Sequence, residues 1–240
     1  MAHPADTPRH PVWSMFDRIA HRYDLLNRLL SFGRDVAWRK QIARHLPPGT
    51  ALRVLDLATG TADVLLENSR RTGRIAWGVG VDPSAGMLSF GRKKLRESAL
   101  SGKHALVRGD AAQLGLQSEI FDAVTIAFGI RNVDDPSAGL REMCRVLKPG
   151  GRALVLEFSL PANALFRGVY LFYFRHVLPR IGGIISGDPA AYRYLNKTVE
   201  AFPYGDAFCR LMREAGFAQA EALPLTFGIA TLYIGEKAGE

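Results

Sequence analysis

The sequence predicts an α/β fold with a doubly wound, mostly parallel seven-stranded sheet and an antiparallel strand at its edge. Short apolar segments typical of buried strands alternate with helical segments along most of the 240 residues, which is the pattern of parallel βα units. The first three strands end at or near an acid, at Asp56, Asp82 and Asp110. Two last strands, 218–225 and 229–236, are so close in sequence that we expect a hairpin at the sheet edge. The acids predict a ligand at the carboxyl edge of the sheet.

The composition fits one such domain with additions. Hydrophobic residues make up 48% of the chain, enough for a sizeable core. Cys144 and Cys209 lie far apart without a CxxC motif, and the histidines form no HxxxH pair, so we expect buried thiols and no metal. Residues 1–11 lack the apolar core of a signal peptide, and we expect a cytoplasmic protein.

The charge balance is basic, with 31 Lys and Arg against 23 Asp and Glu and a net charge of +8. This excess admits nucleic acid or an anionic membrane surface as a partner. Because the basic residues are scattered, we expect a solvated basic face and no nucleic acid, with an RNA-modifying protein as the rival prediction. A homodimer is the assembly that we consider for this chain.

Residues 1–46 precede the first strand, and most of them are predicted to be helical. Apolar side chains recur at intervals of three and four, at Phe16, Ile19, Tyr23, Leu26, Leu29 and Leu30. Polar residues such as Asp24 are also dense here. Two roles stay open, a helix that only packs and a lid over the carboxyl edge of the sheet. We treat 1–46 as a helical lid and 47–240 as the main domain.

The first βα unit contains the stretch that the other elements serve. An apolar strand, 53–57, contains Asp56 and runs into a turn of small residues at Gly60, where a ligand can approach the backbone closely. The apolar residues that follow predict a helix whose N-terminal amides face this turn. The second strand ends at Asp82, about 20 residues after the glycine, which is the interval at which an acid meets a ribose.

The remaining units follow the same pattern. In order, we expect a helix to about residue 99 that turns Met87 inward, strands over 105–111 and 121–129, a helix over 136–147 that ends before Pro149-Gly150-Gly151, a fifth strand over 152–158 and a helix over 205–215. These elements complete the predicted sheet together with the hairpin.

Residues 160–204 form an insertion that we expect to cover the substrate, and its segment 164–186 is strongly apolar and aromatic. Arg167, Arg175 and Pro179 exclude a membrane span. The segment is then a wall for an apolar substrate, a patch that touches a bilayer surface, or an ordinary buried helix. With the basic excess, it predicts peripheral contact with an anionic membrane.

The first loop also limits the cofactor. A dinucleotide fold needs G-x-G-x-x-G so that a pyrophosphate lies on the helix N-terminus, whereas this loop has Gly60 alone and Asp56 before the turn. An acid repels a pyrophosphate but suits S-adenosylmethionine, which carries a sulfonium, an amino group, a ribose and an adenine. We expect Asp56 either to order the loop or to meet the amino group. Asp82 would bind the ribose, and Asp110 with the Ala111 amide the adenine.

Specific motifs extend along nearly the whole chain. They are Phe16-Asp-Arg-Ile-Ala-His-Arg-Tyr-Asp24, Asp56-Leu-Ala-Thr-Gly-Thr-Ala-Asp63, Gly109-Asp-Ala111, Phe128-Gly-Ile-Arg-Asn-Val133, Leu147-Lys-Pro-Gly-Gly151, Leu154-Val-Leu-Glu-Phe-Ser159 and Tyr192-Arg-Tyr-Leu195. With them the sequence resembles the ubiquinone/menaquinone biosynthesis C-methyltransferases, a family with the class I, Rossmann-like methyltransferase fold. The first loop marks only the superfamily, whereas the other motifs are more specific.

The resemblance implies S-adenosylmethionine as the cofactor. The predicted cofactor-binding set is Asp56, Ala58, Gly60, Thr61, Asp82, Met87, Asp110, Ala111 and Ala127. Within it, Thr61, Asp82 and the Asp110–Ala111 pair match cofactor-binding positions of the family. Ala127 stands where some ubiquinone-type members carry a serine. This alanine and the Gly-Thr-Ala-Asp form of the first loop are more like menaquinone-type members.

The implied reaction is methyl transfer to a ring carbon of a polyprenylated quinol, demethylmenaquinol to menaquinol, with the ubiquinone precursor 2-polyprenyl-6-methoxy-benzoquinol as the alternative. Ionisation of the neighbouring hydroxyl makes that carbon nucleophilic. We expect Arg131 to stabilise the phenolate or orient a water, unless it only pairs with Asp134 or Asp135, and Asn132 to hold a ring oxygen. The other candidates for pocket polarity or the base are Tyr23, Asp24, Asp188 and Tyr194.

Overall fold

The computed structural model describes residues 17, 28, 31, 33–180 and 189–239, without side chains at 189–193 and 195. Three predicted site residues, Tyr23, Asp24 and Asp188, lie outside these residues.

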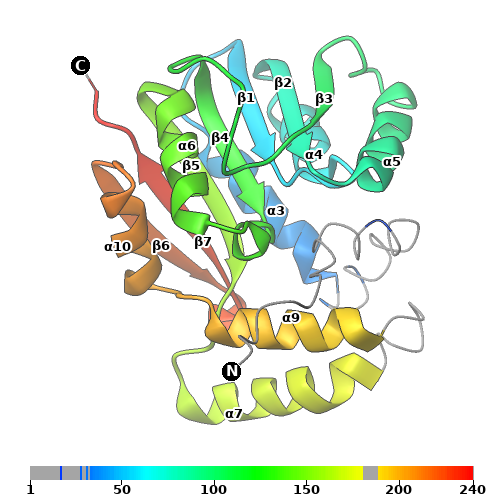
Figure 1. Cartoon of the computed structure of the whole chain (residues 1–240), viewed down its shortest axis with the longest axis vertical. Helices are drawn as coiled ribbons and strands as arrows, with labels where there is room; N and C mark the ends of the chain where they lie inside the picture. Colours follow the sequence, from blue (N-terminus) through cyan, green and yellow to red (C-terminus); the bar gives the residue numbers. More distant parts are fainter. Residues whose placement is uncertain (1–16, 18–27, 29–30, 32, 181–188, 240) are drawn as a thin grey trace, which may run out of the picture.

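Seven strands form one sheet in the order β3-β2-β1-β4-β5-β7-β6 (Figure 1). They are β1 (Leu52–Leu57), β2 (Ile75–Asp82), β3 (His104–Arg108), β4 (Phe121–Ala127), β5 (Leu147–Phe158), β6 (Gln219–Leu225) and β7 (Ala230–Glu236). The pairs from β3 through β5 are parallel, and β7 is antiparallel to both β5 and β6. The predicted sheet and hairpin are confirmed. The antiparallel strand β7 lies second from the edge. It pairs with β5 on one side and with β6 on the other, so β6 is the edge strand.

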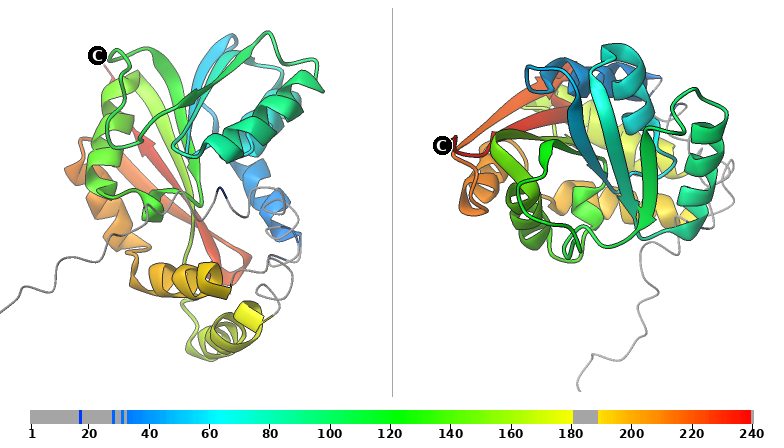
Figure 2. Two further views of the ribbon diagram at one scale, coloured as in Figure 1. Left: turned by 45° about the vertical axis from the view of Figure 1, so that its right-hand side comes forward. Right: turned by 90° about the horizontal axis from the view of Figure 1, so that it is seen from above.

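Helices cover both faces of the sheet (Figure 2). They are α3 (Arg34–His45), α4 (Asp63–Thr72), α5 (Ala85–Arg96), η2 (Ile130–Asn132), α6 (Pro136–Val146), α7 (Ala164–Phe172), η3 (Tyr173–Val177), α9 (Pro189–Ala201), α10 (Asp206–Glu214) and η4 (Thr226–Gly228). On one face, α3 and α4 share a core cluster with the strands, and on the other α6 and α10 do so. Both predicted buried cysteines, Cys144 and Cys209, lie in the cluster that α6 and α10 share with the strands.

Three boundaries differ from the prediction. Helix α6 ends at Val146, and β5 begins at Leu147, because Leu147 already pairs with Phe121 before the register shifts at the Pro-Gly-Gly segment. Strand β3 ends before Asp110. Helix α3 contributes Trp38 and Ile42 to the core. The role of residues 1–46 as a lid stays a prediction.

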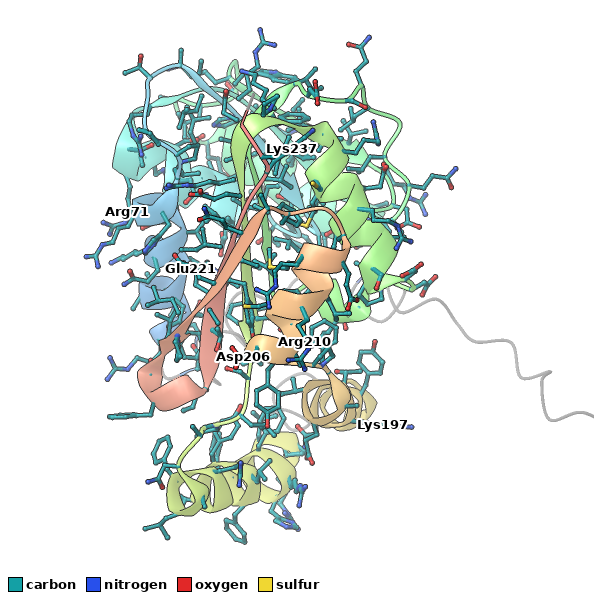
Figure 3. The ribbon with its side chains drawn as sticks, turned by 90° about the vertical axis from the view of Figure 1, so that its left-hand side faces the viewer. Arg71, Lys197, Asp206, Arg210, Glu221 and Lys237 are labelled. Atoms are coloured by element: carbon teal, nitrogen blue, oxygen red, sulfur yellow. The ribbon has the colours of Figure 1, made fainter. Side chains whose placement is uncertain are left out.

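Helices α7 and α9 lie across the carboxyl ends of the strands, beyond the sheet (Figures 1 and 2). They share a small core of their own, made of Tyr170, Phe174, Leu178 and Val199. Figure 3 shows Lys197 of α9 pointing away from this core into solvent. Within the described part of the chain, no helix is long and apolar enough to cross a membrane.

Candidate active site

The loop after β1 has a backbone that small residues make accessible. Ala58, Gly60 and Ala62 all have positive φ, at 46°, 55° and 65°, a region that costs free energy for residues with a Cβ. A Cβ at Gly60 would meet nothing within 4 Å. The backbone of this turn therefore faces open space, as close approach of a ligand requires.

Asp56 lies beneath this loop and is buried. Its Oδ2 accepts a hydrogen bond from the Thr59 hydroxyl at 2.6 Å, and its Oδ1 accepts one from the Thr125 hydroxyl at 2.5 Å. Burial raises the pKa of Asp56 to about 6, although both hydroxyls act in the opposite direction. Of the two predicted roles for Asp56, this geometry favours the ordering of the loop.

Asp82 joins the first loop to the second. Its Oδ2 accepts the Gly60 amide and its Oδ1 the Ser84 amide, both at 2.8 Å. Burial raises its pKa. Asp17, from the N-terminal segment, accepts hydrogen bonds from the Ser84 hydroxyl and, at 2.9 Å, from the Gly86 amide. This contact of Asp17 was not predicted. It joins residues almost 70 positions apart, and no local sequence pattern indicates such a contact.

The other predicted cofactor residues differ in their exposure. Met87 and Ala111 are buried, and Ala127 is half-buried at the end of β4. The exposed Asp110 accepts the amide of its own loop at Ala112, while the neighbouring Gly109 amide donates to the Asp82 carbonyl at 3.2 Å. The end of the third strand is thus adjacent to the end of the second.

Thr61 is buried, and its hydroxyl accepts a hydrogen bond from Lys94 at 2.8 Å. Lys94 also pairs with Asp63 at 2.6 Å. Two carboxylates, Asp56 and Asp82, lie directly beneath the loop. This set of groups fits a cationic ligand with ribose hydroxyls, such as S-adenosylmethionine, better than a pyrophosphate.

The turn after β4 packs directly on this loop. A Cβ at Gly129 would lie 2.5 Å from the Cβ of Ala58, a distance that real Cβ contacts do not reach, so only glycine fits. The next turn, η2, carries Arg131 and Asn132. The predicted acceptor residues and the predicted cofactor loop are therefore neighbours in space.

Arg131 forms a buried ion pair with Glu157 at the end of β5. Its Nη1 donates to Glu157 Oε1 at 2.5 Å and to the Phe128 carbonyl at 2.9 Å. The side chains are only 6% and 1% exposed. Its guanidinium carbon also lies 5.4 Å from the centre of the Phe158 ring. Glu157, and not Asp134 or Asp135, is the acid with which Arg131 pairs.

Glu157 was not predicted as a site residue. The available signal was an acid that ends a run of apolar residues, as Asp56 and Asp82 do. In contrast, the predicted Tyr194 is brought to the site: its hydroxyl donates to Asn132 Oδ1 at 3.2 Å. Helix α9 is thereby joined to η2.

Comparison with known proteins gives consistent matches. A family model described as the ubiE/COQ5 methyltransferase family matches residues 5–237. The chain is 50% identical to a ubiquinone/menaquinone biosynthesis C-methyltransferase of Geobacter sulfurreducens, with 94% of this chain and 88% of that protein covered. It is 46% identical to a demethylmenaquinone methyltransferase of Thermus thermophilus, covering 93% and 100%. A SAM-dependent methyltransferase from Thermotoga maritima has the same fold, with a TM-score of 0.67 at 22% identity over 94% of this chain and 100% of that one.

Proposed function

Because the chain belongs to the ubiE/COQ5 methyltransferase family, we propose that it transfers a methyl group from S-adenosylmethionine to a ring carbon of a polyprenylated quinol. The observation that carries this proposal is the tight packing of Gly129 on Ala58. It joins an acidic, small-residue loop suited to a sulfonium cofactor to a turn whose Arg131 suits a phenolate. The two reactants would then meet at one edge of the sheet.

The preferred acceptor is demethylmenaquinol. Two features support it, the Gly60-Thr-Ala-Asp63 loop and Ala127 in place of a serine. The Thermus relative, named a demethylmenaquinone methyltransferase, is consistent with this choice. The ubiquinone precursor 2-polyprenyl-6-methoxy-benzoquinol is the alternative acceptor, since other relatives carry both quinones in their names.

The cofactor supplies an electrophilic methyl group on its sulfonium, and the residues of the first loop hold it. Asp82 accepts from the ribose hydroxyls with the lone pairs that its two amide contacts leave over. Asp56 acts from below by fixing the turn through two threonine hydroxyls. Asp110 and the Ala111 amide would hold the adenine, and the Gly109 amide before them is bound to the end of β2.

The acceptor residues stabilise the charge that develops on the ring. The carbon becomes nucleophilic as the neighbouring hydroxyl ionises, and the Arg131 guanidinium stabilises the phenolate in a site of low dielectric. Asn132 and Tyr194, joined at 3.2 Å, orient a ring oxygen. Helices α7 and α9, which lie across the carboxyl ends of the strands, exclude water from this site, and the exclusion of water strengthens these interactions.

An apolar face of α7 supports peripheral contact with an anionic membrane, where a polyprenylated substrate resides. Leu165, Val169 and Phe172 follow one another at intervals of four and three and are 81%, 63% and 63% exposed, and Phe227 is 81% exposed. We expect Phe172→Ser to weaken flotation with anionic liposomes at low salt. The matched control is Phe90→Ser, on α5. Equal flotation of both variants and the wild type would contradict this role of α7.

The direct test is an assay with labelled S-adenosylmethionine and both quinols, each in reduced form. We expect methylation of demethylmenaquinol at the higher kcat/KM. Arg131→Ala should lower kcat at least ~100-fold with cofactor affinity retained, whereas the exposed Arg141→Ala should not. Near-normal turnover of Arg131→Ala would overturn its assignment, and inactivity of the wild type on both quinols would overturn the function.

A further inference from the structure

The Arg131–Glu157 ion pair uses only part of its hydrogen-bonding capacity. Glu157 Oε1 accepts from Arg131 Nη1 and from the Phe158 amide at 2.8 Å. Two buried atoms of the same pair, Arg131 Nε and Glu157 Oε2, have no hydrogen-bond partner among the residues that the structure describes. Buried polar groups are almost always paired in folded proteins, so an open donor and an open acceptor in one ion pair indicate that a further group binds here.

The chemistry of these two atoms defines that group. The Nε–H of a guanidinium only donates and the oxygen of a carboxylate only accepts. A hydroxyl can serve either atom, because its oxygen can accept from Arg131 and its hydrogen can be donated to Glu157. A phenol or a water has both abilities, whereas a carbonyl can serve only Arg131 and an ammonium only Glu157.

We propose that Glu157 is the proton acceptor of the methyl transfer and that Arg131 holds the oxygen from which the proton departs. This proposal rests on the proposed quinol methylation. The O–H bond of the quinol breaks, and its proton passes to Glu157 Oε2, directly or through one water that gives up its own proton as it takes that of the quinol. The electron pair left on oxygen moves into the ring, and the ortho carbon forms the new bond to the methyl group as the bond between that methyl group and sulfur breaks, with its electron pair left on the sulfur. The hydrogen on the methylated carbon then moves as a proton to the ring oxygen, which restores the aromatic quinol.

Three tyrosines near the pair, among the residues that the structure describes, are poor acceptors for this proton. Burial raises the pKa of Tyr170 on α7 and of Tyr194 on α9, and it raises the pKa of Tyr233 on β7 to about 12. All three therefore stay protonated near neutral pH. An arginine keeps its proton throughout. Burial also raises the pKa of Glu157, with Arg131 opposing it, and a raised pKa makes its carboxylate a stronger base than usual.

The test replaces Glu157 by glutamine, which keeps the shape and loses the base. We expect Glu157→Gln to lower kcat roughly 100-fold or more, with cofactor affinity and the KM for the quinol within about threefold. Glu142→Gln is the matched control, because Glu142 also pairs with an arginine, Arg145, but on α6. That control should keep the wild-type kcat.

The pH profile separates proton transfer from mere positioning of Arg131. In the wild type, kcat should fall as the pH drops through the pKa of Glu157, because only the carboxylate accepts the proton. In Glu157→Gln the change of rate at the pKa of Glu157 should vanish, and the rate should rise only at the higher pH at which the quinol ionises by itself. An acceptor with a more acidic hydroxyl should restore the variant far more than it accelerates the wild type. A variant that is slow yet keeps the wild-type profile would show that Glu157 only positions Arg131 and would overturn the proposal.

The outcomes also distinguish this proposal from the proposed function. Inactivity of the wild type on both quinols refutes the function itself, whereas an active wild type with an active Glu157→Gln refutes only the role of Glu157. Asp24→Asn and Asp188→Asn, assayed in parallel, would overturn the proposal if either one alone abolished the low-pH fall. If Glu157→Gln does not fold, the wild type decides: its kcat must become independent of pH with an acceptor that is already ionised.

Discussion

Replacing Asp56 by asparagine removes a buried ionisable group from beneath the first loop and keeps its shape. In the wild type, two threonine hydroxyls donate to the carboxylate. An asparagine can still accept from one hydroxyl and donate to the oxygen of the other once that hydroxyl rotates. The substitution therefore isolates the free-energy cost of the buried charge.

The magnitude follows from the pKa, which burial raises from 3.8 to about 6. A difference of one pKa unit corresponds to roughly 1.4 kcal/mol, so ionisation of Asp56 lowers the free energy of unfolding by about 3 kcal/mol. The folded state holds the proton more tightly than the unfolded state. The folded state therefore keeps its full stability below about pH 4, where Asp56 is protonated, and loses about 3 kcal/mol as the pH rises through about 6.

Urea unfolding of the wild type and Asp56→Asn between pH 4 and pH 8 measures this effect. The difference in the free energy of unfolding should shift by about 3 kcal/mol in favour of the variant over that range. A pH-independent offset reports only the altered hydrogen bonds. Asp110→Asn, at an exposed carboxylate, controls for the loss of an aspartate. A difference that stays constant with pH would refute the reasoning.

Two further substitutions test the join between the cofactor loop and the acceptor turn. Gly129→Ala places a Cβ 2.5 Å from that of Ala58. We expect this variant to lower the free energy of unfolding by about 1–3 kcal/mol and to bind the cofactor more weakly, as measured by calorimetry. An unchanged affinity for the cofactor would contradict the close packing. Tyr194→Phe removes the hydrogen bond to Asn132, and we expect the KM for the quinol to rise roughly threefold to tenfold with cofactor affinity unchanged, a result that an unaltered KM would exclude.

The elements of the sheet were predictable because their signals are local. An apolar run followed by an acid or a small-residue turn specifies a strand end within a few residues, and β1 and β2 were both placed in this way. Helix α9 was not predicted. Its apolar residue Val199 joins a small core with Tyr170 of α7 and Phe174 of η3, so the neighbouring sequence gives no indication of its partner.

The pairs that build the site depend on the fold and not on sequence spacing. Arg131 and Glu157 are 26 residues apart, and they meet because β4 and β5 pair in parallel and end at the same edge. The sequence indicated each residue type, but the alternative partners Asp134 and Asp135 were nearer in sequence. Only the strand register decides between them.

Three acids mark the carboxyl ends of strands, and their hydrogen bonds distinguish their roles. Asp56 has both oxygens bound by threonine hydroxyls, and Asp82 has both bound by backbone amides. Each of these carboxylates therefore fixes a loop. Glu157 has one oxygen bound by Arg131 and by its neighbouring amide, while the other is buried and has no partner in the described part of the chain. Since an unpaired buried oxygen costs free energy that a purely structural carboxylate has no reason to bear, the spare oxygen of Glu157 is the one to connect with the proton that the reaction must remove.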